Sequence, residues 1–177
     1  EDIIRFDLGG AEKMVLTGNR LELINPQNNT FVGTGVGQAT TTGLSNTAVG
    51  SPSMLKNTGG SNNCAIGAYT LYENTTGIAN TAIGGGALQY NTTGSWNVAN
   101  GDAALYLNTT GQENTANGRN ALFSNTEGNG NVANGNAALV SNTTGSFNVA
   151  NGYEALFYNT TGTRNVANGY VAMLNNT

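Results

Sequence analysis

A 17-residue unit repeats without insertion through most of this chain, and this strict period constrains the fold more than any other feature. Residues 80–96 read NTAIGGGALQYNTTGSW, and residues 148–164 read NVANGYEALFYNTTGTR. Each unit begins at a recurring asparagine, namely Asn29, Asn46, Asn63, Asn80, Asn97, Asn114, Asn131, Asn148 and Asn165. An unbroken period over many copies is the signature of a solenoid, in which each turn stacks on its neighbours. We number the unit positions from 1, the recurring asparagine, to 17, and call the residues at one unit position a column.

Two glycine columns predict the corners of each turn. Position 5 is Gly in every unit, and position 15 is Gly wherever the chain reaches it. Gly weakens a strand, so its strict recurrence indicates corners that need a positive φ or a close backbone approach. Position 12 is Asn from the second unit on and usually begins Asn-Thr-Thr-Gly, a natural turn sequence. We therefore expect two short strands per unit, around positions 2–4 and 8–10. Gly or Asn interrupts the chain too often for stable helices.

The first of these strands has two faces with different substitution patterns. Position 3 is Ala in every unit except the first, where it is Phe31, and this favours a tight interior. Positions 2 and 4 share the opposite face because strand side chains alternate. Early units combine Thr or Cys at position 2 with Val or Ile at position 4, whereas most later units combine Val with Asn. The unit with Thr115 and Asn117 is the exception.

The asparagines at position 4 of the later units predict a hydrogen-bonded ladder. They are Asn100, Asn117, Asn134, Asn151 and Asn168. A side-chain amide needs partners for its two donors and its carbonyl oxygen, and stacked amides supply these along a fibre or between chains. We expect a structural ladder at an interior or interchain seam. A channel for an ion or ligand is the alternative.

Position 10 predicts a contact between chains. Tyr72, Tyr106, Phe123 and Phe157 occupy it, together with Leu174 in the last unit. A turn with only Ala and Leu or Met facing inward encloses little apolar volume, and an exposed apolar line normally marks an interface. We expect these aromatic side chains to pack between chains.

The first 28 residues do not follow the repeat. Segments 3–8, 12–17 and 20–24 read as three strands, with Gly9-Gly10 and Gly18-Asn19 as the turns between them. The expected organisation is a β-meander cap or connector over residues 1–28, followed by nine solenoid repeats over residues 29–177, the last one incomplete. The chain lacks an initial Met and ends within a repeat, so we expect a piece of a longer protein.

Composition removes several classes of partner. Only 9% of residues are charged, the net charge is −4, and no cluster of Lys or Arg occurs, so nucleic acid is not an expected partner. No apolar run approaches the ~20 residues of a membrane span, so no membrane insertion is expected. With Cys64 alone and no His, we expect no disulfide within the chain, no metal site and no cofactor. The Asn-Thr-Thr triplets match N-glycosylation acceptors, but turn formation explains them without glycans.

The unit resembles the 17-residue Asn-Thr-Ala-Ile-Gly-x-x-Ala-Leu-x-x-Asn-Thr-Thr-Gly repeats of bacteriophage tail-fibre proteins, with residues 80–94 matching fully. It is similar, more loosely, to the heads of trimeric autotransporter adhesins. The resemblance implies a homotrimer on a virion tail fibre or a cell surface, in contact with other fibre or virion proteins. The late Asn at position 4 departs from the Ile or Val of the family pattern.

The expected fold class is thus an all-β repeat β-solenoid, or β-helix, fibre that is trimeric and carries a short N-terminal cap. The expected function is a structural shaft that positions a receptor-binding tip for host attachment. An alternative is that the repeat surface is itself a glycan-binding adhesin, with Trp96, Tyr153 and Tyr170 as possible contacts.

Two further classes fit less well. An ice-binding solenoid would need a flat array of threonines, but the adjacent threonines of Asn-Thr-Thr-Gly point to opposite faces at a corner. A polysaccharide depolymerase would need two carboxylates about 5–10 Å apart. The acidic residues of the repeats stand alone at scattered positions, and we expect no catalytic residues and no enzyme activity.

Overall fold

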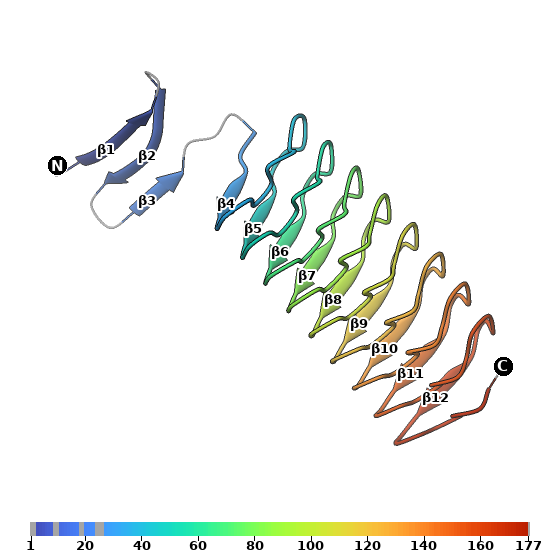
Figure 1. Ribbon diagram of the computed structural model, residues 1–177. Helices are drawn as coiled ribbons and strands as arrows, with labels where there is room; N and C mark the ends of the chain where they lie inside the picture. Colours follow the sequence, from blue (N-terminus) through green and yellow to red (C-terminus); the bar gives the residue numbers. More distant parts are fainter. Residues whose placement is uncertain (1–2, 9–10, 18–19, 24–26, 177) are drawn as a thin grey trace.

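The computed structural model describes residues 3–8, 11–17, 20–23 and 27–176, and the side chains of residues 27–176. These residues form a three-stranded sheet, β1-β2-β3, and a nine-stranded sheet that runs from β4 to β12 in chain order. The nine-stranded part is a rod in which the chain advances by one turn per repeat in a single direction (Figure 1). The described residues contain no helix.

Each repeat contributes one three-residue strand, at positions 2–4. The strands are β4 (Thr30–Val32), β5 (Thr47–Val49), β6 (Cys64–Ile66), β7 (Thr81–Ile83), β8 (Val98–Asn100), β9 (Thr115–Asn117), β10 (Val132–Asn134), β11 (Val149–Asn151) and β12 (Val166–Asn168). Every neighbouring pair is parallel, and each residue lies opposite the residue 17 positions further along, as Ala82 does to Ala99. A single chain therefore completes every turn of the solenoid. The predicted all-β solenoid is confirmed.

The N-terminal segment is an antiparallel meander. Strand β1 (Ile3–Leu8) pairs with β2 (Ala11–Thr17), and β2 pairs with β3 (Arg20–Leu23). The three expected strands are therefore present, but the predicted turns between them lie outside the described residues. Of the described strands, β1, β2 and β3 do not pair with any of the nine strands β4 to β12. Its role as a cap stays a prediction.

The prediction of a second strand in each unit, around positions 8–10, is wrong. Positions 7 and 9 have positive φ in most units, for example 54° at Ala103 and 51° at Leu105. Their backbones still bond to neighbouring turns, since Leu105 N–H donates to Ala121 O at 3.0 Å. In an extended strand Ala104 and Leu105 would face opposite sides, but here both are fully buried. The left-handed conformation of Leu105 lets the side chains of Ala104 and Leu105 both point inward.

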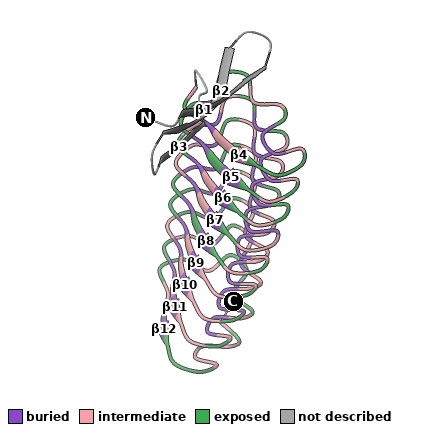
Figure 2. Ribbon diagram, turned by 90° about the vertical axis from the view of Figure 1, so that its left-hand side faces the viewer, coloured by how far each residue is buried: buried purple, intermediate pink, exposed green. Residues whose placement is uncertain are grey.

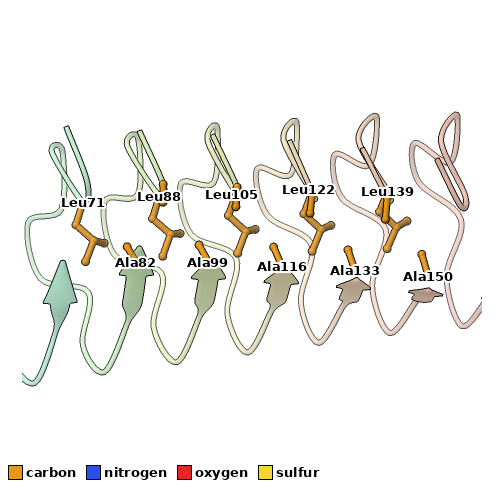
Figure 3. Packing of buried hydrophobic residues seen from close by; sticks show 14 of the residues in the cluster. Leu71, Ala82, Leu88, Ala99, Leu105, Ala116, Leu122, Ala133, Leu139 and Ala150 are labelled. Atoms are coloured by element: carbon orange, nitrogen blue, oxygen red, sulfur yellow. The ribbon is translucent and has the colours of Figure 1, made fainter. Parts of the chain in front are cut away.

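The core is a narrow stack of small and medium apolar side chains. Alanines of the strands, such as Ala82, face leucines at position 9, such as Leu88, across the interior of each turn (Figure 3). Both are completely buried. Burial of apolar surface stabilises a fold by ~25 cal/mol per Å², so each repetition of this pair adds to the stability of the rod.

The first turn fills the same space in a different way. Its position 3 is Phe31 and its position 9 is Gly37, where the other units have Ala and Leu or Met. A Cβ at Gly37 would lie 2.5 Å from Phe31 Cζ, so the aromatic ring occupies the volume that a leucine fills elsewhere. The two exceptions to the repeat compensate each other.

Both predicted glycine corners have a physical requirement. At position 5, φ lies between 115° and 143° in all nine units, a region that only Gly readily adopts. Position 15 instead requires a close approach. A Cβ at Gly60 would lie 2.6 Å from Gly77 O of the next turn and 2.5 Å from Asn74 Nδ2.

Candidate functional site: amide ladders and the outer strand face

Position 1 forms a buried ladder of asparagine amides along the whole solenoid. Asn97 Nδ2 donates to Asn80 Oδ1 of the preceding turn at 3.1 Å and to Gly111 O of its own turn at 2.9 Å. The backbone N–H of Asn97 also donates to Asn80 Oδ1, at 3.0 Å. All Asn97 polar groups are buried, so this ladder joins successive turns without water.

Position 12 forms a second buried ladder. Asn108 Nδ2 donates to Asn91 Oδ1 at 2.8 Å and to Gly111 O at 3.0 Å. Gly111 O therefore accepts from an asparagine of each ladder, and a Cβ at Gly111 would lie 2.8 Å from Asn125 Nδ2 of the position-12 ladder. Sequence reasoning treated position 1 as a repeat marker and position 12 as a turn residue, and it missed both ladders.

The burial of the position-12 asparagines bears on the Asn-Thr-Thr triplets that match N-glycosylation acceptors. Asn74, Asn91, Asn108, Asn142 and Asn159 begin Asn-Thr-Thr triplets, and each is fully buried. Their Nδ2 atoms, to which a glycan would be attached, each donate one hydrogen bond to the asparagine of the preceding turn and one to a glycine carbonyl of their own turn. The triplets are turn sequences.

The predicted ladder at position 4 lies on the outer surface of the chain. Asn117, Asn134 and Asn151 each donate through Nδ2 to the Oδ1 of the next asparagine at 2.8 Å. Their amides donate toward the C-terminal end, whereas the buried ladders donate toward the N-terminal end. Asn100 and Asn168 are exposed and the three between them are half-buried, because the alanines of position 3 occupy the interior.

The side chains of positions 2 and 4 lie on the outer side of the nine-stranded sheet, and we call this surface the outer strand face. Figure 2 shows the strands stacked in one row along the rod, with exposed and half-buried residues along it. In the first four units position 4 is apolar yet exposed, with Val32 at 50%, Val49 at 38%, Ile66 at 42% and Ile83 at 39%. No residue of positions 2 or 4 is charged in any unit. All the charged side chains of the repeats lie in other columns.

The aromatic residues of position 10 are half-buried, and two of them, Tyr106 and Phe123, contact each other. The rings of Tyr106 and Phe123 stack with centroids 5.0 Å apart and an interplanar angle of 8°. Tyr90 adds an edge contact to Tyr106 at 5.2 Å. Tyr72 and Phe157 lie further along the same line, separated from this cluster by Gln89 and Val140. Part of the apolar line is thus covered within one chain, and its packing between chains stays a prediction.

Only two of the three possible glycan contacts lie together. Tyr153 and Tyr170 are exposed at position 6 of successive turns, and their rings stack at 5.3 Å. Trp96 is also exposed, but it lies at position 17, four units before Tyr153. At about 4.8 Å per turn, roughly 19 Å along the rod separates them.

Charged groups of the described residues form isolated pairs on the surface. Lys56 Nζ lies 2.8 Å from Glu73 Oε2 on the next turn, and Arg119 Nε lies 3.8 Å from Asp102 Oδ2. The hydrogen bond to Glu73 raises the pKa of Lys56. Within the described part of the chain, no three His, Cys, Asp or Glu residues are grouped to hold a metal ion. No helix there is long and apolar enough to cross a membrane.

A further hydrogen-bonded column was not expected. Position 16 carries Ser or Asn in several units, and these side chains bond to the preceding turn. Ile78 N–H donates to Ser95 Oγ at 3.1 Å, and Ser95 Oγ donates to Thr93 O at 3.2 Å. The same arrangement recurs at Asn129 and Ser146. Short polar residues at a variable surface position are the only sequence signal for it.

No protein-family model, curated protein or solved structure matches this chain. The β-solenoid and its asparagine ladders are therefore established by the geometry of the chain itself.

Proposed function

We propose that this chain is a structural shaft segment of a surface or virion fibre, which places a receptor-binding tip at a distance for host attachment. The observation that carries the proposal is the uniform stack of turns, joined by two buried amide ladders from Asn29 to Asn165 and from Asn57 to Asn176. Such a stack is rigid along its axis and grows by about 4.8 Å with each unit, which suits a spacer.

The shaft is proposed to be a homotrimer, in contact with other fibre or virion proteins. The outer strand face supports association because it is uncharged and its position-4 residues are apolar and exposed in the first four units. Any partner that is to follow it over many turns needs the same rise per turn, and another copy of this chain has it. The number three comes from the resemblance to trimeric fibres.

Electron cryomicroscopy of the intact particle or cell that carries this chain tests the proposal. Antibody fragments against the repeats are expected to decorate the middle of a fibre, between its base and its distal tip. Decoration of the distal tip at the point of host contact would instead support a direct adhesin.

The exposed Tyr153–Tyr170 stack favours the glycan-binding adhesin as a second candidate, because aromatic faces pack against sugars. A glycan array probed with the wild-type chain and with a Tyr153→Ala, Tyr170→Ala variant tests it. Binding that the double variant loses supports the adhesin. Equal signals from the two chains would contradict it.

A further inference from the structure

The outer strand face changes character once, between the fourth and the fifth turn. Position 4 carries Val32, Val49, Ile66 and Ile83, and then five asparagines from Asn100 to Asn168. Position 2 changes in the opposite sense, from Thr or Cys to Val, with Thr115 as the exception. The face is therefore a two-block pattern with a single boundary, between Ile83 and Asn100 on adjacent strands.

The amides of the second block have bonding capacity left over. Asn134 and Asn151 each use one N–H and one acceptor of the carbonyl oxygen within the ladder, as Asn134 does with Asn117 and Asn151. A primary amide offers two N–H donors and two acceptor lone pairs. The remaining donors and acceptors recur once per turn on a half-buried surface, so a second identical row of amides can satisfy them.

We propose that this two-block pattern makes copies of the chain align parallel to one another and in register. This inference rests on the assembly of copies proposed above. Parallel, in-register copies place apolar turns against apolar turns and amides against amides. A slip of one turn sets Ile83 of one copy against Asn100 of another, and each further turn of slip adds one more such mismatch. An antiparallel arrangement in full overlap sets the four apolar turns against four amide turns and leaves only the fifth turn, that of Asn100, against an amide.

The physical basis is the penalty for covering a polar group without a partner. An amide buried against isoleucine loses water and gains no hydrogen bond, whereas an amide against an amide keeps its bonds. A single buried asparagine fixes register in paired helices for the same reason, and it does so at a cost in stability. Here the ladder stands where an unbroken row of Ile would bury more apolar surface.

Disulfide trapping at the native cysteine tests this alignment. Cys64 lies at position 2 on the outer strand face, and Thr81 lies one turn further along the same column. Wild-type chains are co-expressed with differently tagged chains that carry Cys64→Ser and Thr81→Cys, and the assembly is then oxidised. In-register copies form disulfides between chains of one kind, whereas a slip of one turn forms them between the two kinds. Disulfides require Cβ atoms about 3.5–4.5 Å apart, which a slip of one turn removes.

The decisive variant replaces all five position-4 asparagines with Ile on both kinds of chain. We expect disulfides between like chains to exceed mixed ones by about tenfold with the native ladder and to lose most of that excess without it. The matched control Ile66→Asn, Ile83→Asn keeps two blocks and moves the boundary, so its register is expected to hold. An equal excess in the five-fold variant would overturn the proposal.

A milder pair of substitutions provides a second measurement if the five-fold variant does not fold. Asn100→Ile with Asn117→Ile moves the boundary by two turns and uses a residue that position 4 already carries. Co-expressed with wild type, this chain is expected to sort into its own oligomers in native mass spectrometry, and random mixing would overturn the proposal. A wild-type chain that is monomeric would overturn the proposed assembly as well, which separates the two failures.

Discussion

Asn91 Nδ2 donates to Asn74 Oδ1 of the preceding turn at 2.8 Å, and neither side chain is exposed to solvent. Asn91 also donates to Gly94 O at 3.0 Å and accepts from Asn108 Nδ2 at 2.8 Å. One side chain therefore joins three consecutive turns and holds a corner of its own. Buried amides of this kind therefore contribute more to the stability of the fold than asparagines on the surface do.

Asn91→Ala is expected to lower the free energy of unfolding by about 3 kcal/mol, because Asn74 Oδ1 and Asn108 Nδ2 each lose a buried partner. Chemical denaturation followed by circular dichroism measures the change, at one fixed protein concentration since association contributes to stability. Asn136→Ala is the control. It removes an exposed asparagine at position 6, and a change within about 0.5 kcal/mol is expected. Equal effects of the two substitutions would contradict the ladder's structural role.

Gly59 and Gly60 are adjacent in sequence, but substitution by Ala is expected to change the stability of the fold differently at the two positions. A Cβ at Gly60 overlaps Asn57 Oδ1 and lies 2.6 Å from Gly77 O, so Gly60→Ala is expected to destabilise by about 3 kcal/mol or more. A Cβ at Gly59 meets only Thr42 Oγ1 at 3.4 Å and Thr76 Cγ2 at 3.9 Å. Gly59→Ala is therefore expected to be neutral or to stabilise by up to about 1 kcal/mol. Thermal melts of the two variants check the pair, and a similar loss in both would show that the position-15 contact is not as close as described.

Ser53 stands at position 8, where six later units have Ala, and its buried hydroxyl has no partner among the described residues. Ser53→Ala is expected to raise the free energy of unfolding by about 1 kcal/mol, because it removes an unsatisfied polar group. Thr70, in the same column of the next unit, donates to Gly67 O at 2.9 Å. Thr70→Ala removes a satisfied hydroxyl and a buried methyl group, so it is expected to destabilise. Chemical denaturation is expected to show changes of opposite sign in the free energy of unfolding for the two variants. Destabilisation by Ser53→Ala would contradict the expectation for Ser53.

Raising the pH above 10 is expected to lower stability. Burial, and then the hydrogen bond with Tyr90, raises the pKa of Tyr106 above its usual value of 10.0. The hydrogen bond to Glu73 raises the pKa of Lys56 above its usual value of 10.5. A raised folded-state pKa means that stability is complete below the unfolded value and declines as pH rises through the folded value.

Thermal melts at pH 7, 9 and 11 measure this decline. Tyr106→Phe keeps a ring for the stack on Phe123 but has no hydroxyl to ionise, so its loss between pH 9 and 11 is expected to be smaller. An equal loss in the variant would assign the decline to other groups.

The sequence alone predicted the repeating turn, its glycine corners and the shared face of positions 2 and 4, since all three follow from period and alternation. It did not predict the conformation of positions 7 to 9. Leu88 has a φ of 52°, which leucine disfavours in isolation, and the packed interior imposes it.

The buried ladders were missed for a different reason. An asparagine such as Asn97 that recurs every turn can mark a corner or an interior hydrogen bond, and the period is the same for both. The exceptions Phe31 and Gly37 in the first turn are explained only by the structure, in which the Phe31 ring occupies the space that a side chain at position 37 would need.

Sedimentation equilibrium of the complete chain tests the central claim, an associated fibre shaft, most directly. The account predicts a mass of three times 18.1 kDa at micromolar concentration, with no loss of mass on moderate dilution. A single species of 18.1 kDa across the same range would contradict it.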